Sequence, residues 1–199
     1  MCLRSSLLSF LLLSFLVGCG NSGDSEGDTY FASGEYEKAI QAYSDYIAIT
    51  PSHVKSIYNR GRAYEELGQL DNAMADYERV LKIDPKNQNA YLSVGQLYYN
   101  EGDFDNALFY FDTAIKEGRS NAQAFVLRGR ANHKLGNTDE AMEDYSAAIS
   151  VDSQNGEAYL YRGALRVAQK KINSGCQDLK KALALKVPAA ADAVEKYCP

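Results

Sequence analysis

The chain repeats itself every 34 residues, and this period constrains its fold more than any other feature. Three kinds of residue recur at that interval: a glycine, an alanine and an aromatic residue. They are Gly61, Gly95, Gly129 and Gly163; Ala39, Ala73, Ala107 and Ala141; and Tyr43, Tyr77, Phe111 and Tyr145. A period of this size is typical of stacked supersecondary units. One unit cannot cover its own apolar face, so neighbouring units must bury one another.

Each unit has the pattern of two helices. In residues 54–87, Gly61 and Tyr64 lie on one face of a predicted first helix that ends at Gly68. A second apolar stretch follows, from residue 73 to 81, and stops before Asp84-Pro85. We call the recurring glycine, alanine and aromatic residues the marker residues. Because the glycine and the alanine are small, the two helices of the pair are predicted to cross closely. The unit is therefore expected to be an antiparallel helix hairpin.

This combination of period, small residues, aromatic residue and closing turn resembles the tetratricopeptide repeat (TPR) family over nearly all of the chain after its first residues. The resemblance implies an all-α solenoid of stacked helix hairpins with a C-terminal capping helix. The expected segments are a partial repeat at 28–53, full repeats at 54–87, 88–121, 122–155 and 156–188, and the cap at 189–199. The first helix of the partial repeat is expected to be short, at about 28–33.

The N-terminus predicts export and a lipid anchor. Arg4 precedes an apolar stretch at 7–17, which is too short to span a bilayer and is typical of a secretory signal. The sequence from Leu16 to Cys19 resembles the lipobox of bacterial lipoproteins, which implies removal of residues 1–18 and lipidation of Cys19. An ordinary signal peptide with an unmodified cysteine is the alternative. Residues 19–27 are expected to form a flexible tether, and Gly20 favours the outer membrane of the cell envelope.

Two cysteines remain near the C-terminus. Cys176 lies near the start of a predicted helix, a turn follows at Val187-Pro188, and Cys198 ends the predicted cap. The two cysteines are nearly equidistant from this turn, so an antiparallel hairpin places them side by side. In an exported protein this arrangement predicts a disulfide. Two buried free thiols are the alternative.

A charge pair also repeats with the units. Arg60, Arg128 and Arg162 precede the marker glycine in three units, and Asp76, Asp144 and Asp178 follow sixteen residues later. In the remaining full unit, Val94 and Tyr110 replace both charges together. Buried charges are tolerated when they are matched, so the pattern predicts Arg–Asp contacts inside the hairpins. The alternative is that these arginines face a ligand.

The resemblance to TPR proteins implies a concave groove, lined by the first helix of each hairpin, that binds a segment of a partner protein. The implied partner-binding residues are Lys55, Tyr58, Asn59, Arg62, Asn89, Gln96, Tyr99, Arg130 and Tyr161. Flanking positions in the same implied lining are Glu65, Leu92, Ser93, Gln123, Val126, Leu127, His133, Glu157, Leu160 and Ala164. The Lys/Asn clamp that some family members use for a C-terminal carboxylate is not reproduced.

The sequence offers no pattern for chemistry. His53 and His133 have no nucleophile or carboxylate at a catalytic or metal-binding spacing. The net charge is −5, without a basic stripe, which argues against nucleic-acid binding. We therefore expect no enzyme activity, no cofactor and no metal. The favoured hypothesis is a membrane-anchored adaptor for another envelope protein. The alternatives are a surface carrier of a glycan or small ligand, and a lipoprotein that self-associates through a weakly capped first repeat.

Overall fold

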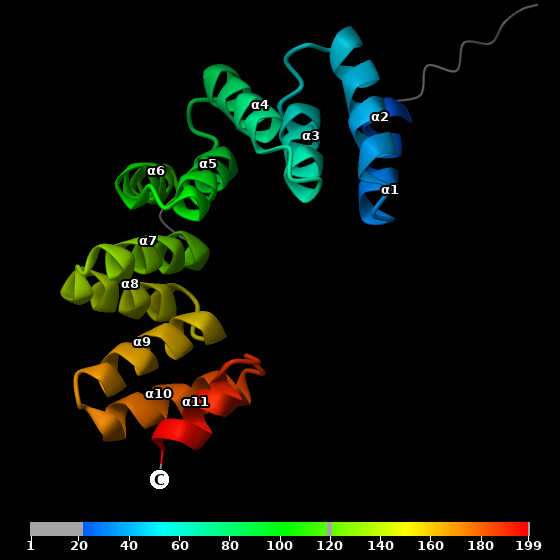
Figure 1. Cartoon of the computed structure of the whole chain (residues 1–199). Helices are drawn as coiled ribbons and strands as arrows, with labels where there is room; N and C mark the ends of the chain where they lie inside the picture. Colours follow the sequence, from blue (N-terminus) through cyan, green and yellow to red (C-terminus); the bar gives the residue numbers. More distant parts are fainter. Residues whose placement is uncertain (1–21, 119–120, 199) are drawn as a thin grey trace, which may run out of the picture.

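The chain is a curved stack of helix hairpins (Figure 1). The computed structural model describes residues 22–118 and 121–198. The helices in these ranges are α1 (Ser22–Ala32), α2 (Tyr36–Ile49), α3 (Val54–Glu66), α4 (Leu70–Ile83), α5 (Gln88–Glu101), α6 (Phe104–Glu117), α7 (Ala122–Leu135), α8 (Thr138–Val151), α9 (Gly156–Ala168), α10 (Ile172–Ala184) and α11 (Ala190–Tyr197). Successive pairs form five hairpins, and α11 follows the last. This confirms the predicted all-α solenoid.

The first helices of the hairpins lie on the inner side of the curve. Helix α1 contacts α3 directly, and α5 contacts α7, although a second helix separates each pair along the chain. Helices on the inner side of a curved stack approach one another more closely than those outside. The first helices of the five hairpins, α1, α3, α5, α7 and α9, therefore line the concave face (Figure 1).

The marker glycines make room for the marker aromatic rings. A methyl group at Gly61 would lie 2.8 Å from the Tyr77 ring, and one at Gly129 would lie 2.7 Å from the Tyr145 ring. Both rings are fully buried. The glycine and the aromatic residue therefore pack against each other within one hairpin, and this contact explains why both recur with the same period.

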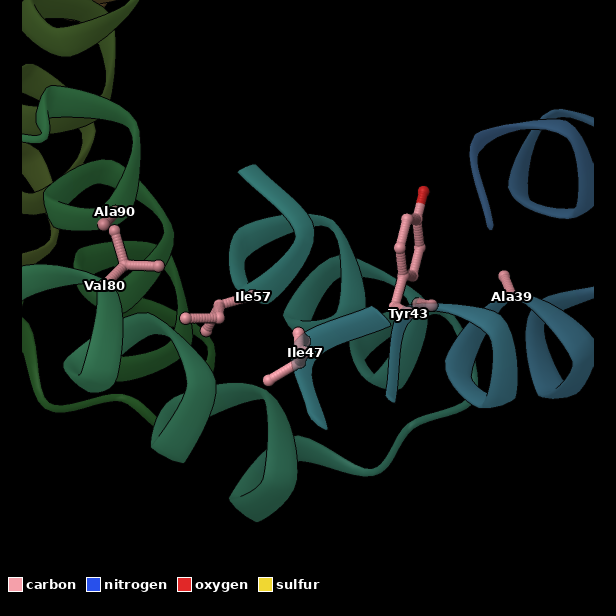
Figure 2. Packing of buried hydrophobic residues seen from close by; sticks show 7 residues of the cluster. Ala39, Tyr43, Ile47, Ile57, Val80 and Ala90 are labelled. Atoms are coloured by element: carbon pink, nitrogen blue, oxygen red, sulfur yellow. The ribbon is translucent and has the colours of Figure 1, made fainter. Parts of the chain in front are cut away.

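Apolar contacts continue from each hairpin to the next. Figure 2 shows Ile47 of α2 and Ile57 of α3 in one cluster with Val80 of α4 and Ala90 of α5. Each of these side chains is buried, with at most 5% of its surface exposed. Burying one large apolar side chain contributes about 1.5–3 kcal/mol to stability. This burial therefore stabilises the contact between neighbouring repeats.

The first repeat is more complete than the sequence analysis expects. Helix α1 begins at Ser22 instead of residue 28, so the prediction that residues up to 27 form a flexible tether is wrong for residues 22–27. Gly27 lies 34 residues before Gly61 and packs against the Tyr43 ring, as the other marker glycines do. The N-terminal hairpin therefore has the same internal packing as the others.

The C-terminal cap is joined to the last hairpin by a disulfide. Cys176 in α10 and Cys198 after α11 are bonded, with their Cα atoms 5.5 Å apart. Ala190 of α11 is fully buried. The cap thus covers the end of the stack, and the bond holds it at the edge where α10 begins.

The predicted signal segment and Cys19 lie outside the described residues. Among the helices of residues 22–118 and 121–198, none has both the length and the hydropathy needed to cross a membrane.

Candidate partner-binding groove

The N-terminal end of the concave face is occupied by contacts within the chain. Lys55 Nζ donates to Asp24 at 2.9 Å and to Asp28 at 2.7 Å, and Asn59 Nδ2 donates to Asp28 at 2.9 Å. Ser56 also donates to Asp24. These bonds dock α1 onto α3, so Lys55 and Asn59 stabilise the first repeat and are not free donors for a partner.

The middle of the face offers more open groups. Arg62 is exposed and lies over the Phe31 ring at 4.5 Å from its centroid. The Tyr58 hydroxyl is 3.2 Å from Ser93 Oγ, which links the face of α3 to that of α5. Gln96 donates to Asn100 at 2.9 Å. The structure also places Asn89 on the surface at the start of α5.

A pocket with cationic side chains lies at the centre of the face. It has a volume of about 410 Å³ and is lined by Tyr99, Arg130, His133, Lys134, Tyr145 and Tyr161. The Arg130 guanidinium lies 4.8 Å from the Tyr99 ring centroid and 5.7 Å from that of Tyr161. The pocket thus combines residues from α5, α7, α8 and α9, and brings together three predicted groove residues from three repeats.

Tyr145 has an unusual environment in this pocket. Its side chain is fully buried, and its hydroxyl has no hydrogen-bond partner among the described residues. Burial raises the pKa of Tyr145 well above its ordinary value of 10, and Tyr161 adds to the rise, while Arg130 opposes it. Burial also raises the pKa of Tyr161. Both phenols therefore remain protonated at neutral pH and can donate a hydrogen bond.

Two of the implied groove residues do not reach the groove. Val126 is completely buried and Leu127 is 7% exposed. Val126 packs with Ala148 and Ala158, while Leu127 packs with Phe111. They lie on the apolar stripe of α7, which the adjacent hairpins cover. Their placement in the lining is therefore wrong, because a helix of this solenoid is covered on two sides.

The repeated arginines form internal ion pairs, as predicted. Arg60 donates to both carboxylate oxygens of Asp76 at 2.8 and 2.7 Å. Arg128 and Arg162 pair in the same way with Asp144 and Asp178. The aspartates are 3–5% exposed. These arginines therefore serve the fold and do not belong to the groove.

Each of these arginines also reaches the preceding hairpin. Arg60 Nη1 donates to Ser44 at 3.0 Å, and Arg128 Nη1 donates to Asp112 at 2.8 Å. In the hairpin without the pair, Tyr110 stacks on Tyr98 with centroids 5.4 Å apart. An aromatic contact therefore replaces the ion pair in that repeat.

The two histidines lie in different parts of the fold. His53 caps α3, where its side chain accepts from the Ser56 backbone N–H. His133 lines the central pocket. No group of three or more histidine, cysteine, aspartate or glutamate side chains is placed to hold a metal ion within the described ranges.

Sequence reasoning missed two members of the central pocket. The sequence analysis assigns no binding role to Tyr145 or Lys134. The sequence does hold a signal for this pocket, which appears when equivalent positions of the repeats are compared. Asp28 and Glu65 of earlier repeats are acidic, whereas the equivalent residues Arg130 and His133 are basic.

Comparisons with known proteins agree with this architecture. The family profile described as "TPR repeat" matches residues 27–68 and 61–102, and that described as "Tetratricopeptide repeat" matches residues 93–158. Together they span two thirds of the chain. No curated protein matches in sequence.

Solved structures share the fold at low sequence identity. A crystal structure of MamA is 23% identical, with a TM-score of 0.71, over 80% of this chain and 94% of that one. YrrB, described as a TPR protein with an unusual peptide-binding site, is 18% identical with a TM-score of 0.67, over 87% and 90%. A thermophilic TPR protein from Thermus thermophilus is also 18% identical with a TM-score of 0.67, over 88% and 95%.

Proposed function

Because the chain belongs to the tetratricopeptide repeat family, we propose that it is an adaptor that binds a segment of another protein in its concave groove. TPR domains bind proteins and peptides, which supports this class of partner. The observation that carries the proposal is the central pocket, where Arg130 stands between two tyrosine rings without an ion pair to any described residue. Tyrosine and arginine are among the side chains that are most enriched at the centres of protein interfaces.

The adaptor is further proposed to be held at a bacterial membrane by lipid on Cys19. The support is the sequence from Leu16 to Cys19, and stable anchoring needs two or more acyl chains. Only two residues separate Cys19 from the start of α1 at Ser22. The groove would then be presented close to the membrane surface. Gly20 supports the outer membrane as the location.

The anchor is tested by Cys19→Ser. This variant is expected to leave the membrane fraction and to lack the mass of attached lipid. An unchanged distribution between membrane and soluble fractions would contradict lipid anchoring, but it would leave the groove proposal intact.

The groove is tested by crosslinking and capture from the protein's own membranes, with mass spectrometry of the captured proteins. Changing both Arg62 and Arg130 to Glu is expected to weaken capture of the specific partner, because both side chains lie on the concave face. Their substitution should cost little stability, since Arg62 is exposed and Arg130 is partly exposed. The matched control is Glu78→Arg with Glu143→Arg, which reverses two exposed charges on the outer helices α4 and α8. Loss of capture in the control alone would place the binding face on the convex side.

A further inference from the structure

The buried tyrosines of the repeats differ in what their hydroxyl groups meet. Tyr43 donates to Asp28 Oδ1 at 2.7 Å, and Tyr77 donates to Glu65 Oε2 at 2.8 Å. Both acceptors are carboxylates on the first helix of the same hairpin. In the next repeat Phe111 takes the position and has no hydroxyl. In this fold a buried tyrosine at the marker position is thus normally satisfied by a carboxylate.

Tyr145 is the exception. The position equivalent to Asp28 is Arg130, and the position equivalent to Glu65 is His133. Both places from which a carboxylate reaches the hydroxyl in other repeats therefore hold a basic residue. The Tyr145 hydroxyl is left buried without a partner among the described residues, and an unsatisfied buried polar group is unfavourable by about 1–3 kcal/mol.

The surroundings of this hydroxyl are cationic. Arg130 is held between the Tyr99 and Tyr161 rings, and Lys134 stands at the same pocket. No aspartate or glutamate within residues 22–118 and 121–198 lines this pocket. Glu157 of α9 acts on Tyr161 and Asp144 acts on Tyr145 from nearby, but neither is part of the lining, and Asp144 is paired with Arg128. A chain with more acidic than basic residues thus keeps an unneutralised positive site on its concave face.

We propose that this pocket receives the carboxylate of an aspartate or glutamate side chain on the bound partner segment, with Arg130 and the Tyr145 hydroxyl as its hydrogen-bond donors. The inference rests on the proposed function, and names the chemistry that one part of the groove recognises. The partner's carboxylate would supply the acceptor that the chain itself supplies to Tyr43 and Tyr77.

The geometry favours a carboxylate on a side chain. A planar guanidinium presents paired N–H groups that match the two oxygens of a carboxylate. The Tyr99 and Tyr161 rings that flank Arg130 form apolar walls for the methylene groups of a glutamate stem. Because both rings also hold the guanidinium in place before binding, less side-chain entropy is lost when the ion pair forms.

The test uses three blocked peptides and the full-length lipoprotein in detergent. The probes are acetyl-Ala-Ala-Glu-Ala-Ala-amide, the same peptide with Gln, and the same peptide with phosphoserine. Ligand-observed saturation-transfer NMR measures weak binding and shows which peptide protons contact the protein. The Glu peptide is expected to bind with its side-chain methylene protons receiving the most saturation. The Gln peptide is expected to bind at least about tenfold more weakly.

Matched variants separate the pocket from the rest of the groove. Arg130→Gln is expected to lower affinity for the Glu peptide by about tenfold or more, as for loss of a charge-assisted pair. Tyr145→Phe is expected to lower it by about two- to tenfold. The variant should be at least as stable as the parent, because it removes an unsatisfied buried hydroxyl and Phe111 already fills the equivalent buried position. Lys82→Gln is the control, since it removes an exposed positive charge on the outer helix α4, away from the groove. It should leave affinity unchanged.

Equal binding of the Glu and Gln peptides, or no loss of affinity in Arg130→Gln, would overturn the inference. Binding of the phosphoserine peptide more than about tenfold tighter than the Glu peptide would also overturn it, in favour of a phosphate ligand. The capture experiment tests the proposed function separately. If the variant with Arg62 and Arg130 changed to Glu fails to capture the partner, the proposed function stands even when the peptide experiments overturn this inference. If that variant keeps its partner, the groove proposal itself fails.

Discussion

At the scale of single residues, the repeated arginines each join three helices. Arg128 of α7 binds Asp144 of α8 and Asp112 of α6, so one guanidinium links two hairpins. These pairs could be predicted from the sequence because arginine and aspartate appear and disappear together at a fixed spacing. Ser44 and Asp112 could not be predicted as second acceptors, because the residue at that position changes from repeat to repeat.

Arg128→Ala is expected to destabilise the protein by about 3 kcal/mol, because it leaves the buried Asp144 without its counter-ion. Asn132 still donates to Asp144 at 3.0 Å, which limits the loss. Urea unfolding measures the change. Arg130→Ala is the neighbouring control and should cost less than about 1 kcal/mol, since Arg130 makes no ion pair with any described residue. Equal losses in the two variants would contradict the assigned roles.

The central pocket shows why a functional site can escape a periodic analysis. Its residues come from three repeats, and Tyr145 has the same residue type as the core positions Tyr43 and Tyr77. Only the missing partner of its hydroxyl distinguishes it. The hydroxyl lacks a partner because Arg130 and His133 stand where Asp28 and Glu65 bind the equivalent tyrosines. The period alone does not show that these positions contact the hydroxyl.

At the scale of elements, the first helix was predicted too short and the last was predicted well. The polar sequence from residue 21 to residue 28 is typical of a tether, yet its residues Asp24 and Asp28 bind Lys55 of α3. Gly27 indicates the longer first helix, because it lies 34 residues before Gly61 and extends the glycine period to the first repeat. The prediction is wrong because a polar, acidic sequence also suits a helix whose carboxylates pair with a lysine on the next first helix.

The docking of α1 is expected to weaken in acid. Burial opposes ionisation of Asp28, but hydrogen bonds from Lys55, Tyr43 and Asn59 outweigh it and hold the pKa of this carboxyl below its ordinary value of 3.8. A depressed folded pKa gives stability that is present above the unfolded pKa and is lost as pH falls through the folded pKa. Protection of α1 amides from hydrogen exchange should therefore fall as the pH is lowered through and below the ordinary carboxyl pKa of 3.8, relative to α9.

Asp28→Asn is the control for this prediction, because its side chain does not titrate. It should lower α1 protection at about pH 5 and remove the part of the acid dependence due to Asp28. Identical pH profiles in the parent and in Asp28→Asn would contradict the role of this carboxylate.

The cap should respond independently of the repeats. Cys198→Ser breaks the disulfide across 22 residues, and the chain-entropy account gives about 3 kcal/mol for a loop of this size. Exchange protection is expected to fall in α11 and at the start of α10, while α3 to α6 stay unchanged, since repeat stability is a sum of local terms. A uniform loss over all hairpins would show that the stack unfolds as one unit.

At the scale of the whole molecule, the stack presents one continuous inner face whose N-terminal end differs from its centre. Near α1 its polar groups are bound internally, and at α5, α7 and α9 it leaves a cationic pocket with an unsatisfied hydroxyl. The residues that recur with the period form the core and set the curvature of the stack. The proposed binding site is formed where residues such as Arg130 and His133 differ from the equivalent residues of earlier repeats. If Cys19 carries lipid, this face acts close to the membrane.

Photocrosslinking in native membranes tests the central claim most directly. A photoreactive residue replaces Gln96 on the inner helix α5 in one variant and Glu143 on the outer helix α8 in another. A specific crosslink to one partner protein from position 96, absent from position 143 and lost when Arg130→Glu is added, is the predicted result. A crosslink from position 143 alone would contradict binding in the concave groove.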